Sequence, residues 1–148
     1  MAEIKISELS IGDWVRVDDF DKVLIKRVSA IDGTRNQIGI IKNNRGGIYW
    51  YCNDEIEPIP LTPEILEKNG FVYSRVSRWY KCELKDTQRT TIGVHFGLIG
   101  ADRIEISSVD AFDEDWNTID VMINKPIKGV HQLQHALRLA GVEKEITL

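Results

Sequence analysis

Closely spaced turn signals in the first part of the chain limit what this sequence can fold into. Runs rich in β-branched and aromatic residues are each bounded by glycine, asparagine or aspartate, as expected of short strands. The runs are 13–17, 22–31, 37–41 and 48–52. Strands so short and close together leave no chain for helices that would cover a wide sheet. We therefore expect them to close into a small barrel, which protects their edges.

The stretch SIGDWVRV (Ser10–Val17) resembles the opening of SH3-like barrels, whose first strand follows a Gly-Asp-x-Val turn. The resemblance covers residues 1–58 and implies a separate SH3-like β-barrel domain there. A composition with 43% hydrophobic residues and only four prolines is that of a globular chain.

A helix is predicted directly after this first domain. Thr62 is a good N-cap, Pro63 suits the first helical position, and Gly70 can adopt the left-handed conformation just past the helix end. Before the helix, Pro58 and Pro60 favour an extended connection. The second domain is therefore predicted to span residues 59–148.

Alternating apolar residues then predict strands with one buried face. The pattern occurs in WYKCEL, TIGVHF, RIEIS and TIDVMI, between Trp79 and Ile123. Apolar residues at helical spacing predict a final helix over Val130–Ala140. The fold class is therefore α+β: a small barrel, then an antiparallel sheet covered by two helices.

Two stretches carry a family resemblance. IPLTPEILEKNGF (Ile59–Phe71) and VHQLQHALRLAGVEKEITL (Val130–Leu148) together resemble an uncharacterised family of small proteins found in Bacteroides-type gut anaerobes, their phages and mobile elements. The resemblance implies an intracellular protein of phage or mobile-element origin. It implies no reaction, cofactor or catalytic residue.

Two histidines in the final helix raise the question of a metal site. His131 and His135 have the spacing of the zinc-binding H-E-x-x-H signature, but Gln132 stands where the catalytic glutamate is needed. A third ligand would have to be His95, on the polar side of its strand. A three-histidine zinc site, and with it a metal-dependent hydrolase, is the less favoured alternative.

The same helix face predicts a cationic binding stripe. Helical spacing places His131, His135 and Arg138, with Lys128 just before them, opposite the apolar face. Such a stripe at a helix start could hold a phosphate, a nucleotide or an acidic surface. The alternatives are a solvated face or contact with the acidic run Asp110–Asp115.

That acidic run is expected to be a solvated loop. Its spacing does not match an EF-hand, because position 12 counted from Asp110 is Val121 and not a glutamate. No P-loop, dinucleotide fingerprint or nucleophile elbow occurs either, so we expect no cofactor.

The sequence NNRGGIYWYC offers a second binding surface. Alternation separates Tyr49 and Tyr51 from Ile48, Trp50 and Cys52, so one set should be core and the other available. With Arg45, the two tyrosines could stack bases or grip a peptide. They could equally cover the barrel.

Charge and composition narrow the function. The net charge of −4 is evenly spread, with ten acidic and eight basic residues up to Pro60 and thirteen and eleven after it, unlike a basic nucleic-acid clamp. Two cysteines and no long apolar run indicate a cytoplasmic protein without a membrane span. We expect a non-enzymatic binding or adaptor protein whose partner is a protein or nucleic acid. The alternatives are a nucleic-acid-binding accessory protein and the three-histidine hydrolase.

Overall fold

The computed structural model describes the backbone of residues 3–85, 89–110 and 113–148. Contacts within the chain divide it into two compact units. Unit 1 consists of Met1–Pro60 with Lys128–His131, and unit 2 of Leu61–Ile127 with Gln132–Leu148.

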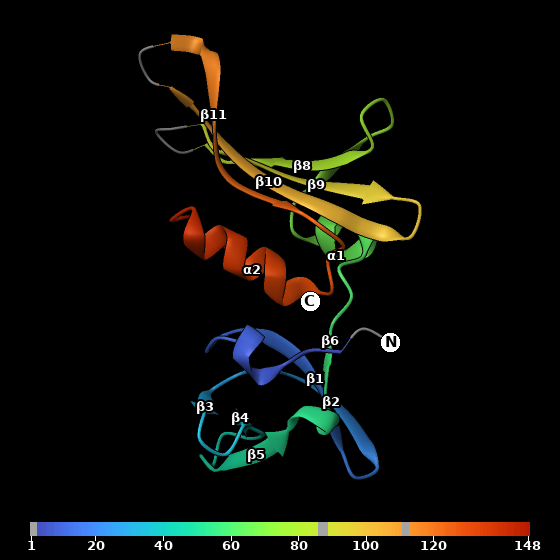
Figure 1. Ribbon diagram of the computed structural model, residues 1–148, viewed down its shortest axis with the longest axis vertical. Helices are drawn as coiled ribbons and strands as arrows, with labels where there is room; N and C mark the ends of the chain where they lie inside the picture. Colours follow the sequence, from blue (N-terminus) through green and yellow to red (C-terminus); the bar gives the residue numbers. More distant parts are fainter. Residues whose placement is uncertain (1–2, 86–88, 111–112) are drawn as a thin grey trace. The chain divides into compact units, whose positions relative to one another are not determined.

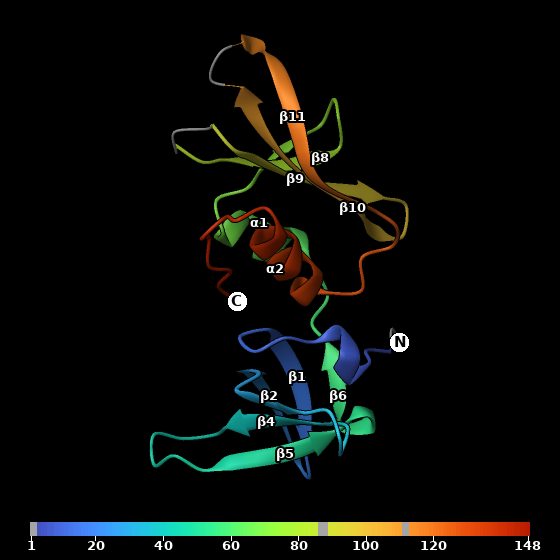
Figure 2. The same ribbon diagram turned by 60° about the vertical axis from the view of Figure 1, so that its left-hand side comes forward.

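Unit 1 contains two antiparallel sheets of three strands each (Figure 2). The first has the order β2-β1-β6 and the second β3-β4-β5. The strands are β1 (Trp14–Asp19), β2 (Lys22–Arg27), β3 (Ala30–Asp32), β4 (Gln37–Ile41), β5 (Ile48–Cys52) and β6 (Ile56–Pro58). Two short 3-10 helices accompany them, η1 (Ile6–Glu8) and η2 (Asn53–Glu55).

The core of unit 1 follows from strand alternation. Val15 and Val17 of β1 and Ile38 and Ile40 of β4 are fully buried, and they alternate with more exposed neighbours on β1. The predicted strands 37–41 and 48–52 are confirmed as β4 and β5. The complete buried cluster is Ile4, Ile6, Leu9, Val15, Val17, Val28, Ile38, Ile40, Tyr51 and Ile56.

The predicted strand 22–31 is instead two strands, and this break shapes unit 1. The N–H of Val28 donates to the carbonyl of Asp13, while that of Ser29 donates to the carbonyl of Gly39. The chain thus changes partners from the first sheet to the second between these residues. Across the described residues of unit 1 the strands form two separate sheets, and no closed barrel is found there.

Unit 2 is built on one antiparallel sheet with the order β11-β10-β9-β8-β7. Its strands are β7 (Val72–Ser74), β8 (Trp79–Glu83), β9 (Thr91–Gly97), β10 (Gly100–Asp110) and β11 (Asp113–Asn124). Helices α1 (Pro63–Lys68) and α2 (Val130–Leu139) both lie on one side of the sheet (Figure 1). The predicted α+β class, an antiparallel sheet with two helices, is confirmed.

One face of this sheet is apolar and buried. Alternate residues of β8, β9 and β10 point to it, and α1 and α2 add buried leucines. The buried residues are Tyr80, Cys82, Ile92, Val94, Ile104 and Ile106 from the sheet and Leu66, Leu133 and Leu137 from the helices. The opposite face carries polar side chains and is described below.

Helix α1 has the predicted ends. Thr62 Oγ1 accepts a hydrogen bond from the N–H of Ile65 at 3.4 Å, and Pro63 occupies the first turn. At the other end Gly70 has φ of +83°, a conformation that suits glycine. The side chain of Asn69 bonds both the carbonyl and the N–H of Thr147, which attaches the C-terminal segment to the helix.

The described backbone of the acidic run is strand and not the loop that the sequence predicts. Strand β10 continues to Asp110, which pairs with Asp113 at the start of β11. The run therefore belongs to a long hairpin, although residues 111–112 and the side chains of 109–120 lie outside what the structure describes. Within the described ranges, no helix is long and apolar enough to cross a membrane.

Two leucines of α2 test this packing. Leu133 is fully buried, whereas Leu139 is 76% exposed. We expect Leu133→Ala to lower the free energy of unfolding by about 2–5 kcal/mol, because it leaves a cavity beneath the sheet. The matched change Leu139→Ala should stay within about 0.5 kcal/mol. Urea unfolding measures both, and equal losses would show that this face of α2 is not the packed one.

Candidate functional site

A groove of about 180 Å³ lies in unit 1 between the β1–β2 turn, the end of β4 and strand β5. It is lined by aromatic side chains from the turn and from β5, together with charged side chains. These are Phe20, Tyr49, Trp50 and Tyr51, and Asp18, Asp19, Lys42 and Glu55. Its location is fixed by the two sheets, because β1 and β5 belong to different ones.

A charged network holds one wall of the groove. Lys42 Nζ donates to both carboxylate oxygens of Asp19 at 2.8 Å, and the hydroxyl of Tyr51 donates to Asp19 at 3.2 Å. The hydrogen bonds that Lys42 donates to Asp19 lower the pKa of the Asp19 carboxyl and raise the pKa of Lys42. Burial raises the pKa of Tyr51. The network joins β1, the residue after β4, and β5.

Lys42 also contacts the aromatic rings of the groove. Its ammonium lies 4.1 Å from the ring centroid of Tyr49 and 5.5 Å from that of Tyr51, within cation–π range. The ring of Tyr49 is therefore already engaged by a cation of the chain itself, although 46% of this residue stays exposed.

Phe20 is the most unusual residue of the groove. It occupies the first position of the two-residue turn between β1 and β2, where its φ of +57° is one that bulky residues avoid. The side chain is fully exposed, at 106% of the reference area. A bulky apolar side chain in a strained and solvated position contributes nothing to the core, and such strain is concentrated at functional sites.

The predicted Arg45, Tyr49 and Tyr51 surface is only partly available. Tyr49 is exposed, but Tyr51 is 4% exposed and belongs to the core, so the prediction that both tyrosines face one open surface is wrong. The reason is that the face of β5 that the two tyrosines share packs into the core of unit 1 at Tyr51 but not at Tyr49. Arg45 lies in the exposed turn before β5 and does not line the groove.

The aromatic residue that the alternation assigned to the other face, Trp50, is 43% exposed and lines the groove. It packs beside Gly39 of the neighbouring strand, where a Cβ would lie 3.3 Å from the indole. Sequence alternation predicts that Tyr49 and Trp50 point to opposite faces, but not that both stay accessible near a sheet edge.

The cationic stripe predicted on α2 does not form as one exposed surface. His131 is only 1% exposed, so its predicted solvent-facing position is wrong. The first turn of the helix is packed, because the N–H of Val130 donates to the carbonyl of Ile59 and a Cβ on Gly129 would meet that same oxygen. Lys128 forms an ion pair with Glu8 at 3.1 Å. His135 is half-buried and Arg138 is exposed.

His95, the third ligand of the alternative zinc site, is held by residues of its own sheet. His95 Nδ1 lies 2.6 Å from Asp102 Oδ1, and its ring packs beside Trp79 at 5.3 Å between centroids. Within the described parts of the chain, the one group of three possible metal ligands is Cys52, Asp54 and Glu55.

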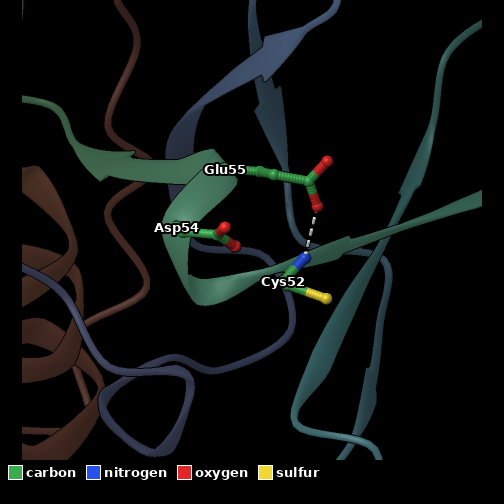
Figure 3. Close-up of side chains that lie close together, drawn as sticks. All are labelled: Cys52, Asp54 and Glu55. Atoms are coloured by element: carbon green, nitrogen blue, oxygen red, sulfur yellow. Dashed lines mark hydrogen bonds between the residues drawn. The ribbon is translucent and has the colours of Figure 1, made fainter.

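That group is explained by local structure. Glu55 reaches back to accept a hydrogen bond from the N–H of Cys52 at 2.7 Å, which caps the short helix η2 (Figure 3). The sulfur of Cys52 accepts a hydrogen bond from Gln37 at 3.4 Å. Cys52 and Glu55 therefore already form hydrogen bonds at the end of β5, and we assign them to the capping of η2.

Comparisons of the chain with models of protein families, with curated proteins and with solved structures give no match. What the protein binds is therefore inferred from the chemistry of its own residues.

The charged network predicts a pH dependence of stability. In the folded protein the pKa of Asp19 lies below its ordinary value of 3.8. Its ionised form therefore stabilises the fold above that pH, and the contribution is lost as the pH falls through the folded pKa. We expect Asp19→Asn to lower the free energy of unfolding at neutral pH. In acid, the free energy of unfolding of the variant should approach that of the original protein.

Urea unfolding over a pH series measures this difference, and Asp21→Asn in the same turn controls for the loss of one negative charge. A difference between the original protein and Asp19→Asn that stays constant down to strongly acidic pH would contradict the role assigned to the Asp19 carboxylate.

Proposed function

We propose that unit 1 is a non-enzymatic binding module that takes an extended, positively charged segment of a partner protein in the aromatic groove. The observation that carries the proposal is Phe20, a fully exposed aromatic side chain held at positive φ over the groove. Binding would bury a side chain that the fold itself leaves in water.

The aromatic content of the groove supports a protein partner. Phe20, Tyr49 and Trp50 are all at least 43% exposed yet gather at one groove. Aromatic residues are enriched in protein interfaces, where tryptophan and tyrosine frequently dominate the binding energy. Strand β5 is also an edge strand of its sheet, so an extended segment can lie along it.

The charge of the residues that line the groove favours a basic protein partner and disfavours a nucleic acid. Three carboxylates, Asp18, Asp19 and Glu55, line the groove against the single cation of Lys42. They would repel a phosphate backbone and attract lysine or arginine side chains, which the ring of Trp50 also favours.

Two expectations from the sequence, one on the fold of unit 1 and one on the origin of the protein, remain part of the proposal. We propose that residues 1–58 are a divergent SH3-like domain, which two three-stranded sheets around one core support. From the motifs at Ile59–Phe71 and Val130–Leu148, we also propose a cytoplasmic adaptor of phage or mobile-element origin that acts on host machinery.

A glycine substitution separates stability from binding. Phe20→Gly relieves the strain of a bulky residue at positive φ, so we expect the free energy of unfolding to stay constant or rise by up to about 1 kcal/mol. Binding of a fluorescent lysine- and arginine-rich peptide should weaken by about tenfold or more, as for a central interface residue. Fluorescence anisotropy and urea unfolding measure the two effects.

The control for this experiment is Leu98→Ser, which removes an equally exposed apolar side chain from unit 2. An acidic peptide of equal length and a single-stranded oligonucleotide serve as competing probes. Preference for the oligonucleotide, or basic-peptide binding that survives Phe20→Gly unchanged, would overturn the proposal.

A further inference from the structure

A second and larger groove, of about 510 Å³, lies on the polar face of the sheet in unit 2. It is lined by strands β8, β9 and β10, whose opposite face forms the core beneath the helices. The indole of Trp79 forms its one aromatic wall. The polar lining residues are Ser77, Lys81, Glu83, Thr91, Glu105 and Ser107.

Strand register explains why the groove exists. Gly93 of β9 pairs with Lys81 on one side and with Glu105 on the other, so the central position between these two side chains holds none. Lys81 and Glu105 are thereby separated by two strand spacings, roughly 10 Å. In the next row of the sheet, Thr91 lies between Glu83 and Ser107 and carries a short side chain.

The aromatic wall is held in place by its neighbours. A Cβ on Gly93 would lie 2.9 Å from the indole of Trp79, so glycine is required for the ring to lie across β9. The ring also contacts His95 and the guanidinium of Arg103, which lies 5.8 Å from its centroid. Asp102 in turn fixes His95 through the 2.6 Å hydrogen bond. Trp79 is a preorganised platform.

The polar groups around this platform match a ligand rich in hydroxyl groups. Glu83 and Glu105 can accept hydrogen bonds, Lys81 can donate them, and the hydroxyls of Ser77, Thr91 and Ser107 can do both. The Oγ of Ser77 is buried and has no hydrogen-bond partner among the residues that the structure describes. The groove therefore contains unused hydrogen-bonding capacity beside an apolar ring face.

We infer that this groove is a saccharide-binding site. A sugar ring carries C–H groups on its faces, which pack against an indole, and hydroxyls around its rim, which need donors and acceptors. Two carboxylates against one lysine disfavour a phosphate-bearing ligand. A single aromatic wall among polar side chains does not suit an apolar ligand either. The inference is independent of the groove in unit 1.

Binding of neutral oligosaccharides tests the inference. We would titrate the full chain with cello-, malto-, xylo- and chito-oligosaccharides and follow the backbone amide signals by NMR. At least one series is expected to shift signals of β8, β9 and β10. Trp79→Ala should weaken that binding about tenfold or more, because it removes the platform.

Two further variants keep the result interpretable. Glu105→Gln changes a partly exposed hydrogen-bonding group without touching the core, and it should also weaken saccharide binding. Trp50→Ala, in the groove of unit 1, should leave it unchanged, which separates this inference from the proposed function. The inference is overturned if none of the oligosaccharides shifts these signals, or if both Trp79→Ala and Glu105→Gln bind as tightly as the original protein.

Discussion

The two-residue alternation of its strands is the constraint on which the rest of this structure depends. In unit 2, Tyr80 and Cys82 point beneath the helices while Trp79 and Lys81 point to the other face. The apolar residues of the pattern stabilise the fold, and the residues between them form the polar face. Because no helix covers the second face among the described residues, its chemistry is set by the side chains that the pattern leaves there.

In unit 1, polar side chains also link the two sheets to each other. Asp19 ends β1, Tyr51 lies on β5, and Lys42 follows β4, so their hydrogen bonds hold elements of different sheets together. This link fixes the wall against which Tyr49 and Phe20 form a groove. Core residues and residues of the proposed site are therefore neighbours there: Tyr51 belongs to the core, whereas Tyr49, two positions earlier, is exposed.

Local signals made much of the fold predictable. The helix ends at Thr62 and Gly70, the strands 37–41 and 48–52, and the buried face of α2 all depend on residues close in sequence. Positions determined by tertiary contacts were not predictable. His131 lies opposite the apolar face of α2 yet is buried, because the start of the helix packs against the segment at Ile59.

The candidate sites were harder to predict, for a related reason. Tyr49 was identified from its strand and Trp50 is its neighbour on β5, but Phe20 joins them only because the turn of one sheet lies beside a strand of the other. The groove of unit 2 depends on the register that places Gly93 between Lys81 and Glu105, and one strand sequence does not specify its partners' register. A lone aromatic residue flanked by aspartates at 18–21 was the available signal for Phe20.

The proposed role of unit 1 is to receive a basic protein segment in its aromatic groove. The most direct measurement is a map of backbone amide shifts as the full chain is titrated with a lysine- and arginine-rich peptide. The account predicts that the largest shifts cluster at the β1–β2 turn, at Lys42 and along β5. Shifts concentrated on α2 around His135 and Arg138, or absent from β5, would contradict it.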